Sequence, residues 1–121
     1  METQILINPS ILNADFNDLE NEIAKVSSTS DFLHLDIMDN VFVPNFTFDL
    51  DRAFEIINFS KLPVDAHLMV NNPEEIAPLY AQNGCTSVTF HLEAATDVAK
   101  TIKDRLKVKN VEVFHQILKH F

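Results

Sequence analysis

Two side chains that can bind a metal or move a proton, His34 and Asp36, lie two residues apart in an otherwise apolar segment. If residues 32–37 form a strand, successive side chains alternate between its faces, so both polar groups share one face. Side chains two residues apart lie about 7 Å apart along a strand, which lets both reach one metal ion or one small substrate. A buried histidine bonded to a neighbouring aspartate explains the pair equally well.

A second segment repeats this pattern. In residues 64–69, Asp65, His67 and Met69 share one face, and valine, alanine and leucine occupy the other. Two consecutive strands then each present a histidine, an aspartate and a methionine on one side. Imidazole and carboxylate are suitable ligands for zinc, iron(II) or manganese. The repeat favours a shared site over two unrelated buried histidines.

The elements that would carry these residues alternate along the chain. Apolar runs bounded by turn residues predict strands, and apolar residues at helical spacing predict helices between them. This β-α alternation, in units of about 25 to 30 residues, predicts an α/β fold with a parallel sheet and crossover helices. The polar faces fall together near the carboxyl ends of the strands, where parallel α/β folds place their sites. The expected strands are 5–7, 32–37, 64–69, 87–92 and 111–114, and the expected helices are 16–26, 49–57, 73–82 and 96–107.

Local signals refine these elements. Asn13 or Asp15 is expected to cap the first helix, and Asp49 or Asp51 the second. Asn40 tolerates the positive φ of a loop turn better than other non-glycine residues. Gly84 suits the left-handed position after a helix.

Composition limits the classes of function. The chain has 121 residues, 46% of them hydrophobic, and a net charge of −9. Acidic residues dominate up to residue 99 and basic residues gather beyond it, so nucleic acid is not an expected partner. No transmembrane-length apolar run or signal peptide is visible, and Cys85 is the single cysteine, expected to be buried. We therefore expect a cytoplasmic protein that does not bind membranes.

Five sequence blocks follow one another along the chain: NPSILNADF at 8–16, HLDIMD at 34–39, FVPNFTF at 42–48, HLMV at 67–70 and VTFHLE at 88–93. In this order they resemble the ribulose-phosphate 3-epimerase family. The resemblance runs from about residue 5 to residue 109 and covers only the first half of the family's (β/α)8 barrel. It implies a partial (β/α)8 TIM barrel of about four to five βα units, in a single truncated domain spanning 1–121 with a divergent tail at 110–121.

The resemblance also implies a reaction. The family interconverts D-ribulose 5-phosphate and D-xylulose 5-phosphate by removing and returning the proton on carbon 3, with one divalent metal ion (zinc, iron(II) or manganese) as cofactor. Matched to the family, His34, Asp36 and His67 are metal ligands, and Asp36 is also a catalytic acid/base. The matched substrate-binding residues are Ser10, His67, Met38 and Met69, although ordinary core packing explains the two methionines nearly as well.

Other interpretations stay open. The family's second acid/base aspartate and its phosphate-binding loops lie on later strands, which implies that this half alone is incomplete. The alternatives are a truncated non-catalytic remnant or interaction module that self-associates through its open sheet edges, and an epimerase of a related hexulose 6-phosphate. Asp39 is expected to have a structural loop role, Asp65 to belong to a buried polar layer, and His91 to neighbour the site without an assigned role.

Overall fold

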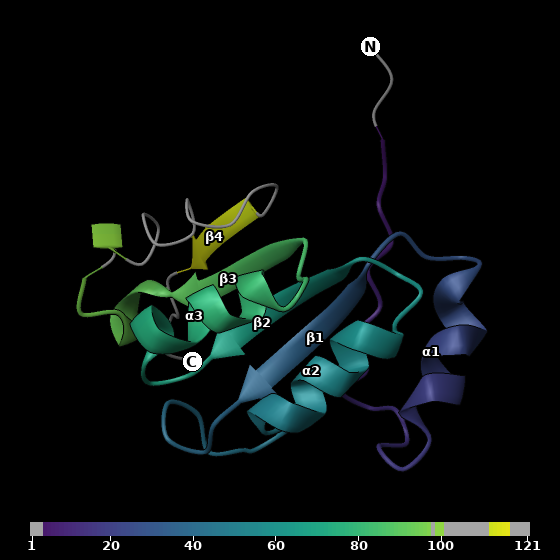
Figure 1. Cartoon of the computed structure of the whole chain (residues 1–121), viewed down its shortest axis with the longest axis horizontal. Helices are drawn as coiled ribbons and strands as arrows, with labels where there is room; N and C mark the ends of the chain where they lie inside the picture. The colour runs from purple at the N-terminus through teal and green to yellow at the C-terminus, as the bar shows by residue number, and fades with distance from the viewer. Residues whose placement is uncertain (1–3, 98, 101–111, 117–121) are drawn as a thin grey trace.

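Helices and strands alternate along the chain (Figure 1). The computed structural model describes residues 4–97, 99–100 and 112–116. The short 3-10 helix η1 (Leu92–Ala94) follows the third strand. The longer elements are, in order, α1 (Leu19–Ser27), β1 (Leu33–Met38), α2 (Leu50–Phe59), β2 (Val64–Met69), α3 (Pro73–Gln82), β3 (Ser87–His91) and β4 (Glu112–Gln116).

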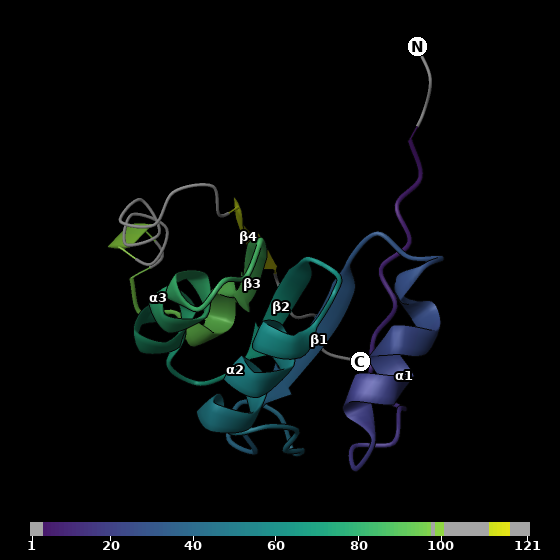
Figure 2. The ribbon, with the colours of Figure 1, turned by 45° about the vertical axis from the view of Figure 1, so that its right-hand side comes forward.

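The strands form one parallel sheet in sequence order, β1-β2-β3-β4. Because parallel neighbours need a crossover, α2 returns the chain from β1 to β2, and α3 returns it from β2 to β3. Figures 1 and 2 show α2 and α3 in front of the same face of the sheet, with α1 beside the β1 edge. The predicted α/β class is confirmed, and consecutive parallel units of this kind match part of a (β/α)8 barrel.

Strict alternation separates the two faces of β1 and β2. The apolar residues of both strands are buried, whereas the polar residues between them are only partly buried. The buried face packs with the apolar sides of α1, α2 and α3 in one core that includes Ile23, Ile56 and Tyr80. In β3 every residue is buried, including Ser87 and His91. The core therefore occupies the helical side of the sheet and leaves the opposite side to polar groups.

The expected first strand at residues 5–7 is wrong. In the structure this segment follows the β1 edge without forming a ladder, and only Ser10 makes a β-bridge, to His34. The backbone N–H of Ile7 donates to the Asp31 carboxylate rather than to a strand, and Pro9 has no N–H to donate. A bond to the Asp31 side chain therefore takes the place of a backbone bond that would extend a ladder.

The first helix begins later than expected, at Leu19 instead of residue 16. Its N-cap is Asp18, so the expected caps Asn13 and Asp15 are wrong. The Asp15 carboxylate instead accepts a bond from the Asn17 N–H, which holds the chain in a turn before the helix. Short-range hydrogen bonds in this turn thus prevent the helix from starting earlier, despite the helical propensity of the segment.

Other local predictions are confirmed. Asp49 caps α2, because its carboxylate accepts a bond from the Arg52 N–H at 2.8 Å. Asn40 has a φ of 60° and Gly84 a φ of 104°, both in the left-handed region. Cys85 is buried. The predicted helix 96–107 lies mostly outside the described residues, and within the described part no helix is both long and apolar enough to cross a membrane.

Candidate metal centre

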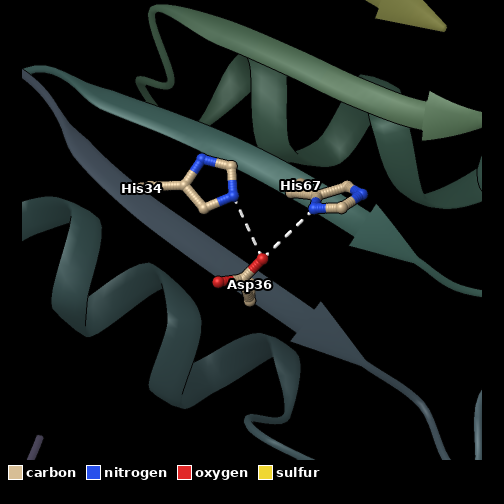
Figure 3. Close-up of side chains that lie close together, drawn as sticks. All are labelled: His34, Asp36 and His67. Atoms are coloured by element: carbon tan, nitrogen blue, oxygen red, sulfur yellow. Dashed lines mark hydrogen bonds and ion pairs between the residues drawn. The ribbon is translucent and has the colours of Figure 1, made fainter. Parts of the chain in front are cut away.

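Three side chains converge on the polar face of the sheet. His34 and Asp36 come from β1 and His67 from β2, and Figure 3 shows both imidazoles directed at one oxygen of the carboxylate. His34 Nε2 lies 3.1 Å from Asp36 Oδ1, and His67 Nδ1 lies 3.2 Å from the same oxygen. One atom of each residue lies within 4.8 Å of the other two. The structure therefore brings together the three residues that the resemblance implies as ligands.

The register of the sheet produces this arrangement. Asp36 pairs directly with His67 in the parallel ladder between β1 and β2, so their side chains rise side by side from the same face. His34 stands two residues before Asp36 on that face. The buried residues between them lock the orientation of both strands, because a slip of one residue would send the polar groups into the core.

The donor set fits a divalent ion. Two imidazole nitrogens and one carboxylate oxygen are ligands that zinc, iron(II) and manganese accept. Two atoms bound to one zinc at about 2 Å each lie no more than about 4 Å apart. Both contacts to Asp36 satisfy this limit. The side chain of Asp36 is 12% exposed, so water competes little for it.

Hydrogen bonds among the charged groups at the centre shift their pKa values. Hydrogen bonds to Asp36 and then to Asp65 raise the pKa of His34 to about 10, against the opposing effect of burial. Burial favours a higher pKa for Asp36, but bonds from His34, His67 and Ser10 outweigh it and lower that pKa well below the usual range. The pKa of Asp65 is lowered in the same way, because bonds from His34 and Ser87 outweigh burial. Both carboxylates are therefore ionised near neutral pH, whereas His34 is protonated there in the absence of a metal ion, so a bound ion would displace one proton from its ring.

Comparison with known proteins identifies the protein family. The sequence matches the model of the ribulose-phosphate 3 epimerase family over residues 6–114. The chain belongs to the ribulose-phosphate 3-epimerase family. Three similar relatives are named ribulose-phosphate 3-epimerase. They come from Mycobacterium leprae (51% identical over 89 residues, 74% of this chain and 39% of the relative), Mycobacterium tuberculosis strain CDC 1551 (44% over 99 residues, 82% and 43%) and Escherichia coli K12 (40% over 102 residues, 83% and 45%).

The chain spans less than half the length of these relatives. The matched region, residues 6–114, contains all three residues of the cluster.

The substrate-binding residues implied by the epimerase family lie near the cluster. The exposed Ser10 donates its hydroxyl hydrogen to Asp36 Oδ2 at 2.6 Å, so both carboxylate oxygens have partners. Met38 and Met69 are register partners at the carboxyl ends of β1 and β2, on the strands that carry the ligands, and both are partly buried. Their contact with substrate remains a prediction.

The structure gives His91 a position that the sequence left unassigned. His91 Nε2 lies 2.8 Å from His67 Nε2, the nitrogen that faces away from Asp36. The ring of Phe42 packs against His91 with centroids 5.3 Å apart. Burial and the neighbouring His67 lower the pKa of His91, so it is neutral and can accept a bond from His67. The signal available in the sequence was that His91 falls on the polar face of its strand, as His34 and His67 do on theirs. A shared face alone does not show a contact.

Asp39 has the loop role that the sequence predicts. Its Oδ1 accepts bonds from the N–H groups of Val41 and Phe42, and its Oδ2 accepts one from Asn71 after β2. These bonds tie the loop that follows β1 to the end of the neighbouring strand. Asp39 thus holds the loop after β1 in place beside the cluster, and its carboxylate bonds to the backbone rather than to the cluster.

Proposed function

We propose that this protein is a ribulose-phosphate 3-epimerase that interconverts D-ribulose 5-phosphate and D-xylulose 5-phosphate. In this proposal His34, Asp36 and His67 hold one divalent metal ion: zinc, iron(II) or manganese. The convergence of both imidazoles on Asp36 Oδ1 carries the proposal. The family assignment supports the reaction. From the family resemblance we also propose that the protein acts in the pentose phosphate pathway of carbohydrate metabolism, and from its composition that it is cytoplasmic.

The chemistry requires a base beside an acidified carbon. A divalent ion bound here would act as a Lewis acid on the negative charge that forms when the carbon next to a ketone loses a proton. Asp36 is the proposed base, because the family resemblance implies that role and its carboxylate lies at the cluster, in contact with both histidines. Ser10 holds Asp36 Oδ2 in place, which keeps the carboxylate oriented towards the cluster.

Inversion also requires a proton donor on the opposite face of carbon 3. The family resemblance assigns that role to an aspartate on a later strand, beyond the matched half. The described residues are therefore proposed to form the wall of the site that holds Asp36. Sugar phosphate is the proposed ligand, and a hexulose 6-phosphate is the alternative substrate.

The test combines metal binding with turnover. Metal content per chain and epimerisation of ribulose 5-phosphate are measured with added zinc, iron(II) or manganese, in the wild type, His34→Ala and His67→Ala. An Asn58→Ala variant, on the exposed side of α2, serves as the control. We expect one bound ion per chain in the wild type and control and none in the histidine variants, with any turnover lost in parallel. A wild type that binds no ion contradicts the proposal.

A non-catalytic association module is the second candidate. Among the described residues, four large apolar side chains are more than half exposed: Ile5 at 81%, Val41 at 70%, Phe46 at 61% and Ile7 at 55%. Open edges and exposed apolar groups favour pairing with another chain. Light scattering coupled to size exclusion tests this. A homo-oligomer that binds metal but shows no turnover favours the module, whereas an active monomer excludes it.

A further inference from the structure

A row of hydrogen bonds crosses three strands beside the cluster of His34, Asp36 and His67. His34 on β1, Asp65 on β2 and Ser87 on β3 are consecutive register partners. His34 Nδ1 lies 3.0 Å from Asp65 Oδ2, and the Ser87 hydroxyl donates to Asp65 Oδ1 at 2.7 Å. Each oxygen of the Asp65 carboxylate therefore has one defined partner.

The position of Asp65 bears on which nitrogen of His34 can bind a metal ion. Without a metal ion, both ring nitrogens of His34 face ionised carboxylates, which only accept hydrogen bonds: Nε2 faces Asp36 and Nδ1 faces Asp65. A metal ion in the cluster would take the lone pair of Nε2, and Nδ1 would keep its hydrogen and donate it to Asp65. Asp65 itself makes no contact with Asp36 or His67 among the bonds of the described residues, so it lies outside the proposed ligand set.

Burial makes this row stiff. The Asp65 side chain is 18% exposed, and Ser87 is 7% exposed. Water therefore has little access to compete for the carboxylate, and the bond from Ser87 prevents it from turning away from His34. If Asp65 were only part of a buried polar layer, it would not need to bond to one particular nitrogen of a histidine that binds metal.

We propose that Asp65, held in place by Ser87, is a positioning residue that fixes the tautomer and the ring orientation of His34 for metal binding. The inference rests on the proposed metal site. In proteins of known mechanism, removing such an outer partner of a ligand histidine typically lowers metal affinity about 10- to 100-fold. The same range is expected here.

The main variant is Asp65→Asn, which keeps the shape of the side chain but removes the charge. The amide can donate to His34 Nδ1 and so favour the tautomer with hydrogen on Nε2, which blocks the nitrogen that faces the cluster. Asp51→Asn is the matched control, because it makes the same chemical change at an exposed position in the first turn of α2. Ser87→Ala is a second variant that leaves Asp65 with one partner fewer.

Zinc affinity is measured by competition with a chromophoric chelator, and circular dichroism establishes folding. We expect Asp65→Asn to lose about 10- to 100-fold in affinity, Ser87→Ala to lose less, and Asp51→Asn to match the wild type. Nitrogen-15 spectra of the zinc-loaded wild type are expected to show His34 with its hydrogen on Nδ1. That signal is expected to be absent or to exchange rapidly with water in Asp65→Asn.

The outcomes separate the two proposals. A wild type that binds zinc together with an Asp65→Asn variant of equal affinity overturns the positioning role and leaves the metal site intact. A variant that melts at a lower temperature but binds zinc equally well shows a purely structural aspartate. A wild type that binds no zinc overturns both. If Asp65→Asn does not fold, unchanged affinity and an unchanged His34 signal in Ser87→Ala overturn the inference, and a loss in both supports it.

Discussion

Two hydroxyl deletions at buried and part-buried positions are expected to change stability in opposite directions. Tyr80 on α3 is fully buried, and its hydroxyl has no hydrogen-bond partner in the described part of the chain. The Thr47 hydroxyl accepts a bond from the Met38 N–H at 3.0 Å and donates to the Asp36 carbonyl at 2.8 Å. Tyr80→Phe therefore removes an unpaired polar group, whereas Thr47→Val removes two bonds next to the candidate ligand Asp36.

The magnitudes follow from the partners that are lost. Burying a hydroxyl without a partner costs about 1–3 kcal/mol, so Tyr80→Phe is expected to leave the free energy of unfolding unchanged or raise it by about 1 kcal/mol. Each paired bond contributes about 1 kcal/mol, so Thr47→Val is expected to lower it by about 2 kcal/mol. For a chain of this size, 1 kcal/mol corresponds to a change in melting temperature of about 3–5 °C.

Urea unfolding followed by circular dichroism measures both variants against the wild type. Equal slopes of free energy against urea establish that only stability has changed. A Tyr80→Phe variant destabilised by more than about 1 kcal/mol would mean that the hydroxyl has a partner, such as an ordered water, and would refute the reasoning. A Thr47→Val variant as stable as the wild type would show that the loop does not depend on the hydroxyl.

Three further predictions concern the loops and the core. Gly84→Ala is expected to cost about 1–2 kcal/mol in urea unfolding, because a φ of 104° strains any Cβ although the nearest side-chain atom, in Ile57, would be 3.7 Å away; an unchanged stability would contradict this. Burial raises the pKa of the Cys85 thiol to about 12, so labelling by a thiol reagent at pH 8 is expected only after unfolding, and rapid labelling of the folded chain would be the contrary result. Bonds from the N–H groups of Asn71, Val41 and Phe42 outweigh burial and lower the pKa of Asp39 below its usual 3.8. The contribution of Asp39 to stability is therefore complete above that pH and is lost as the pH falls through the pKa of the folded state. Asp39→Asn is therefore expected to destabilise the chain in thermal melts at pH 7 and progressively less below pH 3.8, and a difference that does not depend on pH would rule this out.

The sequence predicts the strands of the candidate site well because their alternation is strict. Three of the expected strands correspond to β1, β2 and β3 within a residue at each end. In β1 and β2 apolar and polar side chains alternate, and the core accepts only one of the two faces. Parity also places His34, Asp36 and His67 on one face before any distance is known. Polar residues inside a buried strand are informative because each requires a partner.

The parts that the sequence does not predict depend on tertiary contacts. Residues 5–7 have a strand-like composition, but Asp31 takes the N–H of Ile7. The contact between His67 and His91 is also hidden, because the register partner of His67 is Thr89, two residues earlier. Sequence parity gives the face of each residue. It does not give the tilt of a ring or its choice of neighbour.

Packing on the helical side of the sheet controls chemistry on the other side. Leu35 and Ala66 are register partners with no exposed surface, and each lies beside a cluster residue in sequence. Their burial fixes the register that places Asp36 opposite His67. A displacement of one residue between β1 and β2 would pair Asp36 with an apolar neighbour and separate the donors. The metal cluster and the apolar core are therefore specified by the same alternation, and a core change that loosens this register is expected to weaken metal binding without touching a ligand.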